Sequence, residues 1–230
     1  MSGTKEIVWI TGASSGIGRA LALRMAREGY RVAASARRVA ELEKLAQEAA
    51  AKGGEIVAFP LDTTKPEEVS EAVQRVESAM GPIVIAVLCA GTYEPVLARE
   101  LTAAKARPVF ELNFMGTMHC LEALIGRMTA RKAGRIAVVA SISGYRGLRT
   151  ASAYGATKAA LINMCEALRM ELGDAGITVQ LVNPGFIKTP LTDRNDFPMP
   201  FLMPVNKAVD RFYRGLLTDR FEITFPKRFT

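Results

Sequence analysis

Short apolar runs rich in β-branched residues alternate with longer segments of helical periodicity along the whole chain. The apolar runs predict strands at Ile7–Ile10, Arg31–Ser35, Glu55–Phe59, Ile83–Leu88, Arg135–Ala140, Thr178–Val182 and Glu222–Phe225. The longer segments predict helices at Ile17–Glu28, Val39–Ala51, Pro66–Met80, Arg107–Ala130, Ala153–Leu172 and Val205–Leu217. We therefore expect an α/β fold in which helices cover both faces of a doubly wound parallel sheet of about seven strands.

Local signals support several of these helix boundaries. Thr64 and Glu67 have the spacing of a capping box, in which each side chain bonds to the backbone N–H of the other residue. Glycines follow the predicted ends of the first helices, at Gly29, Gly53 and Gly81. A left-handed residue at such a position ends many helices.

The segment before the last predicted helix has a different pattern. Thr189–Pro204 contains four prolines and no clear period, so we expect an irregular excursion there. We interpret residues 188–204 as a lid over the substrate. Its apolar side chains predict a hydrophobic substrate, and they are Phe197, Met199, Phe201, Leu202 and Met203. Residues 205–226 should form a short helix and an edge strand, followed by a basic tail.

The composition fits one domain over residues 1–230. Hydrophobic residues make up 49% of the 230 residues, and a chain of this length can bury a full core. The net charge of +7 favours anionic partners. It does not choose among them, but no RNA-stacking motif or basic recognition helix supports nucleic acid as a partner.

The cysteines predict free thiols in a reducing compartment, because Cys89, Cys120 and Cys165 are odd in number and widely spaced. They form no C-x-x-C pattern, so we expect no metal site. We expect no leader of the secretory type, and the apolar run from residue 83 to 90 is too short to span a bilayer as a helix. We expect a cytoplasmic protein with no membrane segment.

A glycine-rich stretch, Thr11–Gly18, joins the first predicted strand to the first predicted helix. Glycine lets the backbone turn tightly and approach a pyrophosphate, while the helix N-terminus offers unpaired N–H groups and the positive end of its dipole. A tight turn that needs a positive φ would explain the glycines equally well. The position after the first strand of an alternating chain favours phosphate binding.

Two arginines, Arg37 and Arg38, follow the second predicted strand, where an NAD-binding sheet usually has a carboxylate for the ribose hydroxyl. Guanidinium groups suit a 2′-phosphate, to which they make charge-assisted bonds. The alternative is a solvated start of the next helix, but basic charge there opposes the helix dipole. The pair favours NADP(H) over NAD(H).

Four features occur in one order: the glycine loop, Asn113, Ser141 and the pair Tyr154 and Lys158 at helical spacing. Together they closely resemble the short-chain dehydrogenase/reductase family, over nearly the whole chain. The resemblance implies a Rossmann-type domain and a nicotinamide-dependent oxidoreductase that interconverts a carbonyl and a secondary alcohol.

The family's catalytic roles fall on these residues. Tyr154 would be the general acid/base, Ser141 would orient the substrate oxygen, and Asn113 would support a proton relay. Lys158 would bind the nicotinamide ribose and lower the pKa of Tyr154, which must fall by about 3 units to titrate near neutral pH. A cation about 5 Å away supplies roughly 3 kcal/mol at an effective dielectric constant of about 20.

The resemblance also implies a set of cofactor-binding residues. They are Gly12, Ser14, Ser15, Gly16, Ile17, Gly18, Arg37, Arg38, Asp62, Ala90, Gly91, Tyr154, Lys158, Pro184, Gly185, Ile187 and Thr189. The chain departs from the family at Leu88 and Cys89, where two asparagines are common. We expect weaker bracing of the fourth strand there and read Cys89 as a small buried residue, not as a nucleophile.

Alternatives to this function remain open. A regulatory scaffold that senses NADP without catalysis would have the same fold, and a 3-oxoacyl-carrier-protein-type reductase is a narrower version of the enzyme. A basic cluster could dock an acidic carrier or simply complement a helix dipole, and it comprises Arg127, Arg131, Lys132 and Arg135. The resemblance further implies a homodimer or homotetramer, formed through the helices that carry Asn113 and Tyr154.

Overall fold

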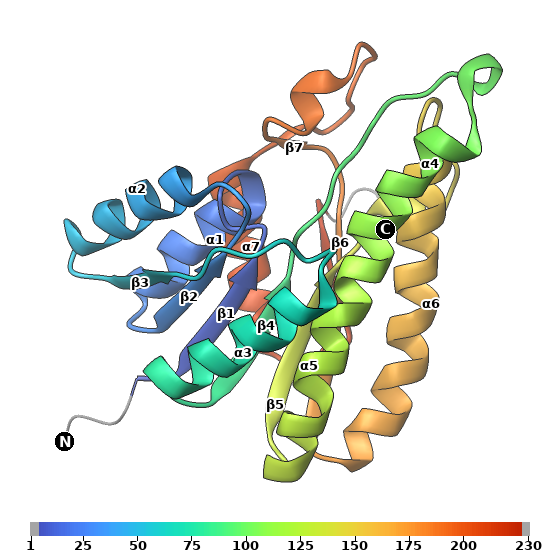
Figure 1. Cartoon of the computed structure of the whole chain (residues 1–230). Helices are drawn as coiled ribbons and strands as arrows, with labels where there is room; N and C mark the ends of the chain where they lie inside the picture. The colour runs from blue at the N-terminus through green and yellow to red at the C-terminus, as the bar shows by residue number, and fades with distance from the viewer. Residues whose placement is uncertain (1–4, 227–230) are drawn as a thin grey trace.

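The computed structural model describes residues 5–226, and its centre is a seven-stranded sheet. The strands are β1 (Ile7–Thr11), β2 (Arg31–Ser35), β3 (Glu55–Ala58), β4 (Ile83–Leu88), β5 (Gly134–Val139), β6 (Ile177–Pro184) and β9 (Glu222–Phe225). They lie in the order β3-β2-β1-β4-β5-β6-β9, and every neighbouring pair is parallel. The predicted doubly wound parallel sheet is confirmed (Figure 1).

Helices cover both faces of this sheet (Figure 1). One face packs against α1 (Gly16–Arg27), α2 (Val39–Ala50) and α7 (Val205–Leu216), and the other against α3 (Pro66–Met80), α5 (Gly116–Arg131) and α6 (Ser152–Asp174). Alternate side chains of one strand serve the two cores. Val8 and Ile10 belong to the first core, while Ile7 and Trp9 belong to the second.

The strand order reverses at β1, which lies between β2 and β4. The loops that leave β1 and β4 therefore run to opposite faces and leave a crevice at the carboxyl edge of the sheet. Thr11 ties the two strands together at this point, because its Oγ1 accepts from the backbone N–H groups of Cys89 at 3.0 Å and Ala90 at 3.2 Å. This bond braces β4 where the family's asparagines are missing.

The predicted helix Arg107–Ala130 begins too late. The helical segment starts with α4 (Ala103–Phe110), continues through a π-helical turn, η2 (Glu111–Met115), and runs on as α5. Thr102 caps α4 by accepting from the N–H of Lys105. Pro108 lies inside α4, where it removes one helical N–H, and the π-helical turn follows and carries Asn113.

The predicted capping box at Thr64 and Glu67 is wrong. Lys65 is the N-cap of α3 and makes no side-chain capping bond. Thr64 bonds to Asp62 and not to Glu67: Oδ1 of Asp62 accepts from both the N–H and the hydroxyl of Thr64. Glu68 rather than Glu67 reaches back, and its carboxylate accepts from the N–H of Asp62.

The proline-rich excursion is closed at its base. A two-stranded parallel sheet forms between β7 (Ile187–Lys188) and β8 (Met203–Pro204), with a short 3-10 turn, η4 (Thr192–Arg194), between them. The excursion stands at the carboxyl edge of the main sheet, in orange in Figure 1. The predicted basic tail lies outside the described residues. Across residues 5–226, no helix combines the length and apolarity needed to cross a membrane.

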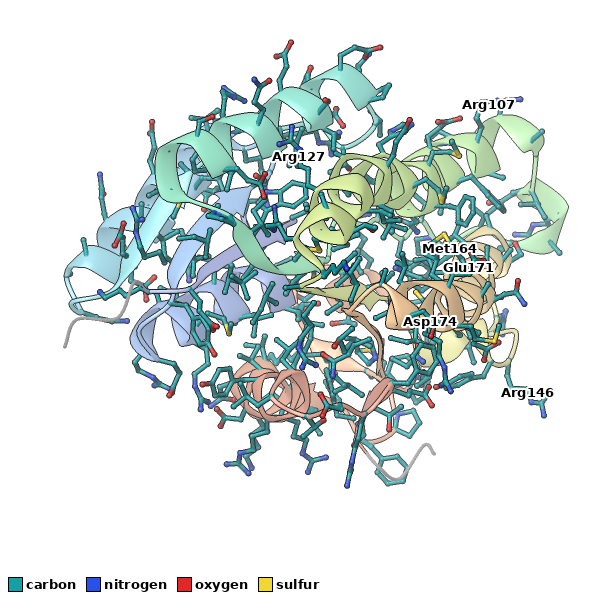
Figure 2. The ribbon with its side chains drawn as sticks, turned by 90° about the horizontal axis from the view of Figure 1, so that it is seen from below. Arg107, Arg127, Arg146, Met164, Glu171 and Asp174 are labelled. Atoms are coloured by element: carbon teal, nitrogen blue, oxygen red, sulfur yellow. The ribbon has the colours of Figure 1, made fainter. Side chains whose placement is uncertain are left out.

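The basic cluster at the end of α5 is largely engaged within the chain. Arg127 and Arg131 both pair with Glu77 of α3, at 3.0 and 2.8 Å, and Arg131 also donates to the carbonyl of Ile83. Figure 2 shows Arg127 on the side of α5 that faces α3. Arg135 donates to the carbonyl of Thr218. These bonds join secondary-structure elements, but two arginines share the single carboxylate of Glu77, so the cluster keeps a net positive charge and the carrier dock stays a prediction.

We predict that Glu77→Gln lowers the free energy of unfolding by about 2 kcal/mol, because it removes the negative charge shared by two arginines and weakens the acceptor for the N–H of Ile83. Urea unfolding at neutral pH measures the change. Glu71→Gln is the matched control, since Glu71 lies exposed on the same helix. Equal stability of the two variants would contradict this role.

Candidate active site

A cavity of about 410 Å³ opens at the carboxyl edge of the sheet, around the reversal point. The loops that follow β1, β2, β4 and β6 line it, together with Ser141 beyond β5 and the first turns of α6. All of the residues predicted to bind cofactor line this one cavity. They are Gly12, Ser14, Ser15, Gly16, Ile17, Gly18, Arg37, Arg38, Asp62, Ala90, Gly91, Tyr154, Lys158, Pro184, Gly185, Ile187 and Thr189.

The glycine loop packs closely against the end of β4 and against its own backbone, which leaves no space for side chains at Gly12 and Gly18. Gly12 has φ +69°, and a Cβ there would lie 2.8 Å from the carbonyl oxygen of Cys89. A Cβ on Gly18 would lie 2.5 Å from the carbonyl oxygen of Gly12. Within the described chain, Ser15 makes no side-chain capping bond to α1, whose first turn has no acidic residue. This cradle fits a pyrophosphate at a helix N-terminus.

Both arginines after β2 lie beside this cradle. Arg38 donates through Nε and Nη2 to the hydroxyl oxygen of Ser14, at 3.2 and 2.9 Å, so its guanidinium is anchored at the loop. Arg37 is 66% exposed in its side chain, and its Nη1 lies 4.0 Å from a carboxylate oxygen of Asp62. The chain passes from Ser35 through Ala36 to the arginines, so no carboxylate occupies the usual ribose position.

Asn113 lies behind the cavity rather than on its wall. Its side chain is fully buried, and its Oδ1 accepts from the N–H of Thr92 at 2.7 Å. Its Nδ2 donates to the carbonyl of Thr92 and to the hydroxyl oxygen of Thr157. Asn113 therefore fixes the segment after β4 against the start of α6.

The other three predicted catalytic residues face the cavity together. Ser141 follows β5, and its Oγ accepts from the N–H and hydroxyl of Ser143. Tyr154 and Lys158 lie one turn apart on α6. Lys158 is 4% exposed, its Nζ donates to the carbonyl of Val139 at 2.8 Å, and the same Nζ lies 5.6 Å from the centroid of the Tyr154 ring.

The protonation states differ from our prediction. Burial raises the pKa of Tyr154 to about 12, and a hydrogen bond with Ser141 opposes this only in part. Burial also lowers the pKa of Lys158 to about 8. The expected lowering of the Tyr154 pKa by Lys158 is therefore not seen: burial is the largest cause of the shift, and Lys158 is not among the groups that lower it.

A second, smaller cavity of about 70 Å³ adjoins the first, and Ser141 and Tyr154 line both. Its other walls are mostly apolar and include Ile142, Leu148, Leu191, Phe186 and Phe197. It also includes Tyr93, which our reading of the sequence missed. The ring centroid of Tyr93 lies 5.2 Å from that of Tyr154, in an edge-on arrangement at 64°. Its place two residues beyond Gly91, at the carboxyl end of β4, could have indicated it.

Cys89 also lines the larger cavity. Burial raises the pKa of its thiol to about 11, so the thiol stays protonated at neutral pH. Cys89 is of intermediate exposure and not buried as predicted, but its protonated thiol agrees with our reading that it is not a nucleophile.

Comparisons with known proteins agree with this geometry. A family model described as short chain dehydrogenase matches residues 6–197. The chain is 38% identical to an uncharacterized oxidoreductase of Myxococcus xanthus over 94% of this chain and 86% of the relative. It is 35% identical to a 3-oxoacyl-[acyl-carrier-protein] reductase of Staphylococcus epidermidis, over 80% of this chain and 76% of that protein.

The fold also matches solved structures. A short-chain dehydrogenase from Sphingobium yanoikuyae in complex with NADPH superposes with a TM-score of 0.87, at 29% identity, covering 96% of this chain and 88% of that one. The chain belongs to the short-chain dehydrogenase family, whose members are oxidoreductases.

The buried lysine predicts a pH-dependent stability. In the folded state Lys158 loses its proton near pH 8, whereas in the unfolded chain it keeps the proton to about pH 10.5. The unfolded state then binds more protons between these values, so the Lys158 contribution to the free energy of unfolding rises with pH in this window. Lys158→Met should remove that rise, measured by urea unfolding between pH 7 and 10. Lys52→Met changes an exposed lysine, so its free energy of unfolding should follow pH as that of wild type does. If the free energy of unfolding of Lys158→Met also follows pH in parallel with wild type, the pKa shift of Lys158 is disproved.

Proposed function

We propose that the protein is an NADP(H)-dependent oxidoreductase that interconverts a carbonyl and a secondary alcohol on a hydrophobic small molecule. One observation carries this proposal: Ser141 and Tyr154 line both the large cavity with a phosphate cradle and the small apolar cavity. A proton donor at such a junction reaches a substrate and a dinucleotide at once.

The large cavity has a chemically suitable group for each part of NADP(H). The glycine loop and α1 would hold the pyrophosphate, Arg37 and Arg38 the 2′-phosphate, and Asp62 the adenine amino group. Backbone at Ala90 and Gly91 would meet the adenine-side ribose. Lys158 would bind the nicotinamide ribose, and the segment Pro184, Gly185, Ile187 and Thr189 would hold the carboxamide and pyrophosphate. The NADPH complex of the Sphingobium relative supports this choice of cofactor.

Bound NADPH supplies a hydride for the carbonyl carbon, and the protein must supply a proton for the oxygen. Tyr154 is protonated at neutral pH, because burial keeps its pKa near 12, so it is a ready acid for carbonyl reduction. Ser141 would donate a hydrogen bond to the same oxygen and orient it. Lys158 is charged below about pH 8 and would stabilise the tyrosinate that proton transfer leaves behind.

Asn113 supports this arrangement from behind. Both ends of its amide are bonded to Thr92, and Nδ2 also reaches Thr157 one residue before Lys158. We propose that it fixes the geometry through which a proton relay returns protons to Lys158.

The small cavity favours an apolar substrate. Its walls carry no charged side chain, and the segment 188–204 contributes Leu191, Asn195 and Phe197 as a lid. A 3-oxoacyl-carrier-protein-type reductase remains the second candidate, favoured by the Staphylococcus relative. A purely NADP-sensing scaffold explains the convergence of Ser141, Tyr154 and Lys158 less well.

We further propose a cytoplasmic homodimer or homotetramer. The outer faces of α5 and α6 expose Met118 and Met170, and the π-helical turn exposes Met115. Met164, labelled in Figure 2, also belongs to α6. An apolar face of this kind suits a second copy of the chain.

Tyr154→Phe should lower kcat/KM for NADPH-dependent ketone reduction by about 10²- to 10⁴-fold, because the ring remains but the proton donor is lost. The loss of NADPH absorbance across a panel of apolar ketones and aldehydes measures turnover. NADPH affinity, measured by fluorescence, should persist. Tyr145→Phe, which removes another hydroxyl bonded to Asn183, should retain wild-type rates. Undiminished turnover in Tyr154→Phe would refute the mechanism.

The double variant Arg37→Ala with Arg38→Ala should weaken NADPH binding by about 10²- to 10⁴-fold, because charged hydrogen bonds contribute about 1.5–3 kcal/mol each. NADH has no 2′-phosphate, so its affinity should change by less than about threefold. Isothermal titration with both cofactors measures the difference. Arg75→Ala with Arg211→Ala removes two exposed arginines elsewhere. Comparable losses for NADPH and NADH would overturn the preference.

A further inference from the structure

Tyr93 follows the strand β4 in an extended segment, yet its side chain is only 6% exposed. Its ring meets the Tyr154 ring edge-on, at 5.2 Å between centroids. It lines the small apolar cavity and is not among the residues that line the larger one. Tyr93 thus touches the proposed acid from the substrate side.

Thr150 holds the phenol end of Tyr93. The Tyr93 hydroxyl and Thr150 Oγ1 lie 3.0 Å apart, and the Thr150 carbonyl accepts from the N–H of Val96 at 3.0 Å. Thr150 has φ +63°, a strained conformation for a β-branched residue. Such strain persists only where surrounding contacts over-determine the backbone. The two loops after β4 and β5 therefore fasten each other around Tyr93.

Arg194 joins the lid to the same residue. It lies in the turn η4, and its Nη1 donates to the carbonyl of Tyr93 at 2.8 Å and to the carboxylate of Glu94 at 2.9 Å. On the other side, Asn113 brackets the preceding residue, Thr92, with bonds to its N–H and carbonyl. In Figure 1 the green segment after β4 and the orange excursion rise together at the carboxyl edge of the sheet.

We propose that Tyr93 is a positioning residue with two separate roles: its ring orients Tyr154, and its backbone carbonyl docks the lid. This inference rests on the proposed function of the site. The Tyr93 ring holds the Tyr154 phenol at the junction of the two cavities, while the Tyr93 carbonyl receives Arg194 when the lid lies over the substrate. The two parts act on different steps: the ring serves proton transfer and the carbonyl serves substrate retention.

Kinetics of three variants separate these parts. Tyr93→Leu removes the ring and should lower kcat by about 10- to 100-fold, because misplacement of a reacting group by about 1 Å has effects of that size. Tyr93→Phe keeps the ring and should hold kcat within about threefold of wild type. Arg194→Met should raise KM by about tenfold and leave kcat within about threefold, because it weakens lid docking only. NADPH affinity should be unchanged in the two Tyr93 variants, whereas Arg194 also lines the larger cavity.

Matched controls test whether general loosening explains the losses. Tyr145→Leu removes a tyrosine from the loop after β5, and the hydroxyl of this tyrosine accepts from Nδ2 of Asn183. Arg99→Met removes an arginine that pairs with the neighbouring Glu100 at 3.5 Å. Both controls should keep wild-type kcat and KM. Equal kcat in Tyr93→Leu and wild type, or the same loss in Tyr93→Leu and Tyr145→Leu, would overturn the proposal.

A spectroscopic readout needs no turnover. The chain has five tyrosines, so ¹³Cζ-tyrosine labelling gives a spectrum in which Tyr154 is assigned from Tyr154→Phe. The Tyr154 signal should move in Tyr93→Leu and stay in place in Tyr145→Leu. An unmoved signal would refute the positioning role even if the enzyme is active. Absence of turnover in wild type, with the signal moving as expected, would instead refute the proposed function and leave the contact established.

Discussion

The burial of Lys158 is the constraint on which the site depends. An ammonium with 4% exposure needs a partner, and the carbonyl of Val139 at the end of β5 supplies it. That bond fixes the first turns of α6 against the carboxyl edge of the sheet. Tyr154, one turn earlier, is thereby held beside Ser141, which follows the same strand. The same burial lowers the pKa of the lysine and raises that of the tyrosine.

The rest of the fold brings other segments to this fixed point. Thr11 fastens the loop after β4 to the end of β1, and Asn113 fastens the next residues of that loop to α6. The loop then carries Tyr93 against the Tyr154 ring. Long-range hydrogen bonds between loops, rather than the loops' own secondary structure, give the site its rigidity. Such bonds allow a reacting group to be held in place before substrate arrives.

Much of the fold could be predicted from the sequence, because strand and helix periodicities are local. These periodicities predicted the parallel sheet and its helices. The glycine loop and the spacing of Tyr154 and Lys158 identified residues that line one cavity. Three features could not be read in this way. The π-helical turn at Asn113 follows an internal proline, the pKa of Tyr154 depends on burial by distant segments, and Tyr93 gains its contacts from loops far away in sequence.

Transfer of a labelled hydride tests the proposed function most directly. The protein would be incubated with NADPH that carries deuterium at the transferable position and with a series of apolar ketones, and the products analysed by mass spectrometry. We predict one deuterium at the carbinol carbon, with about 10²- to 10⁴-fold less labelled alcohol formed in the same time by Tyr154→Phe. Tight NADPH binding without deuterium in any alcohol product would contradict the proposal and favour a protein that binds the cofactor without catalysis.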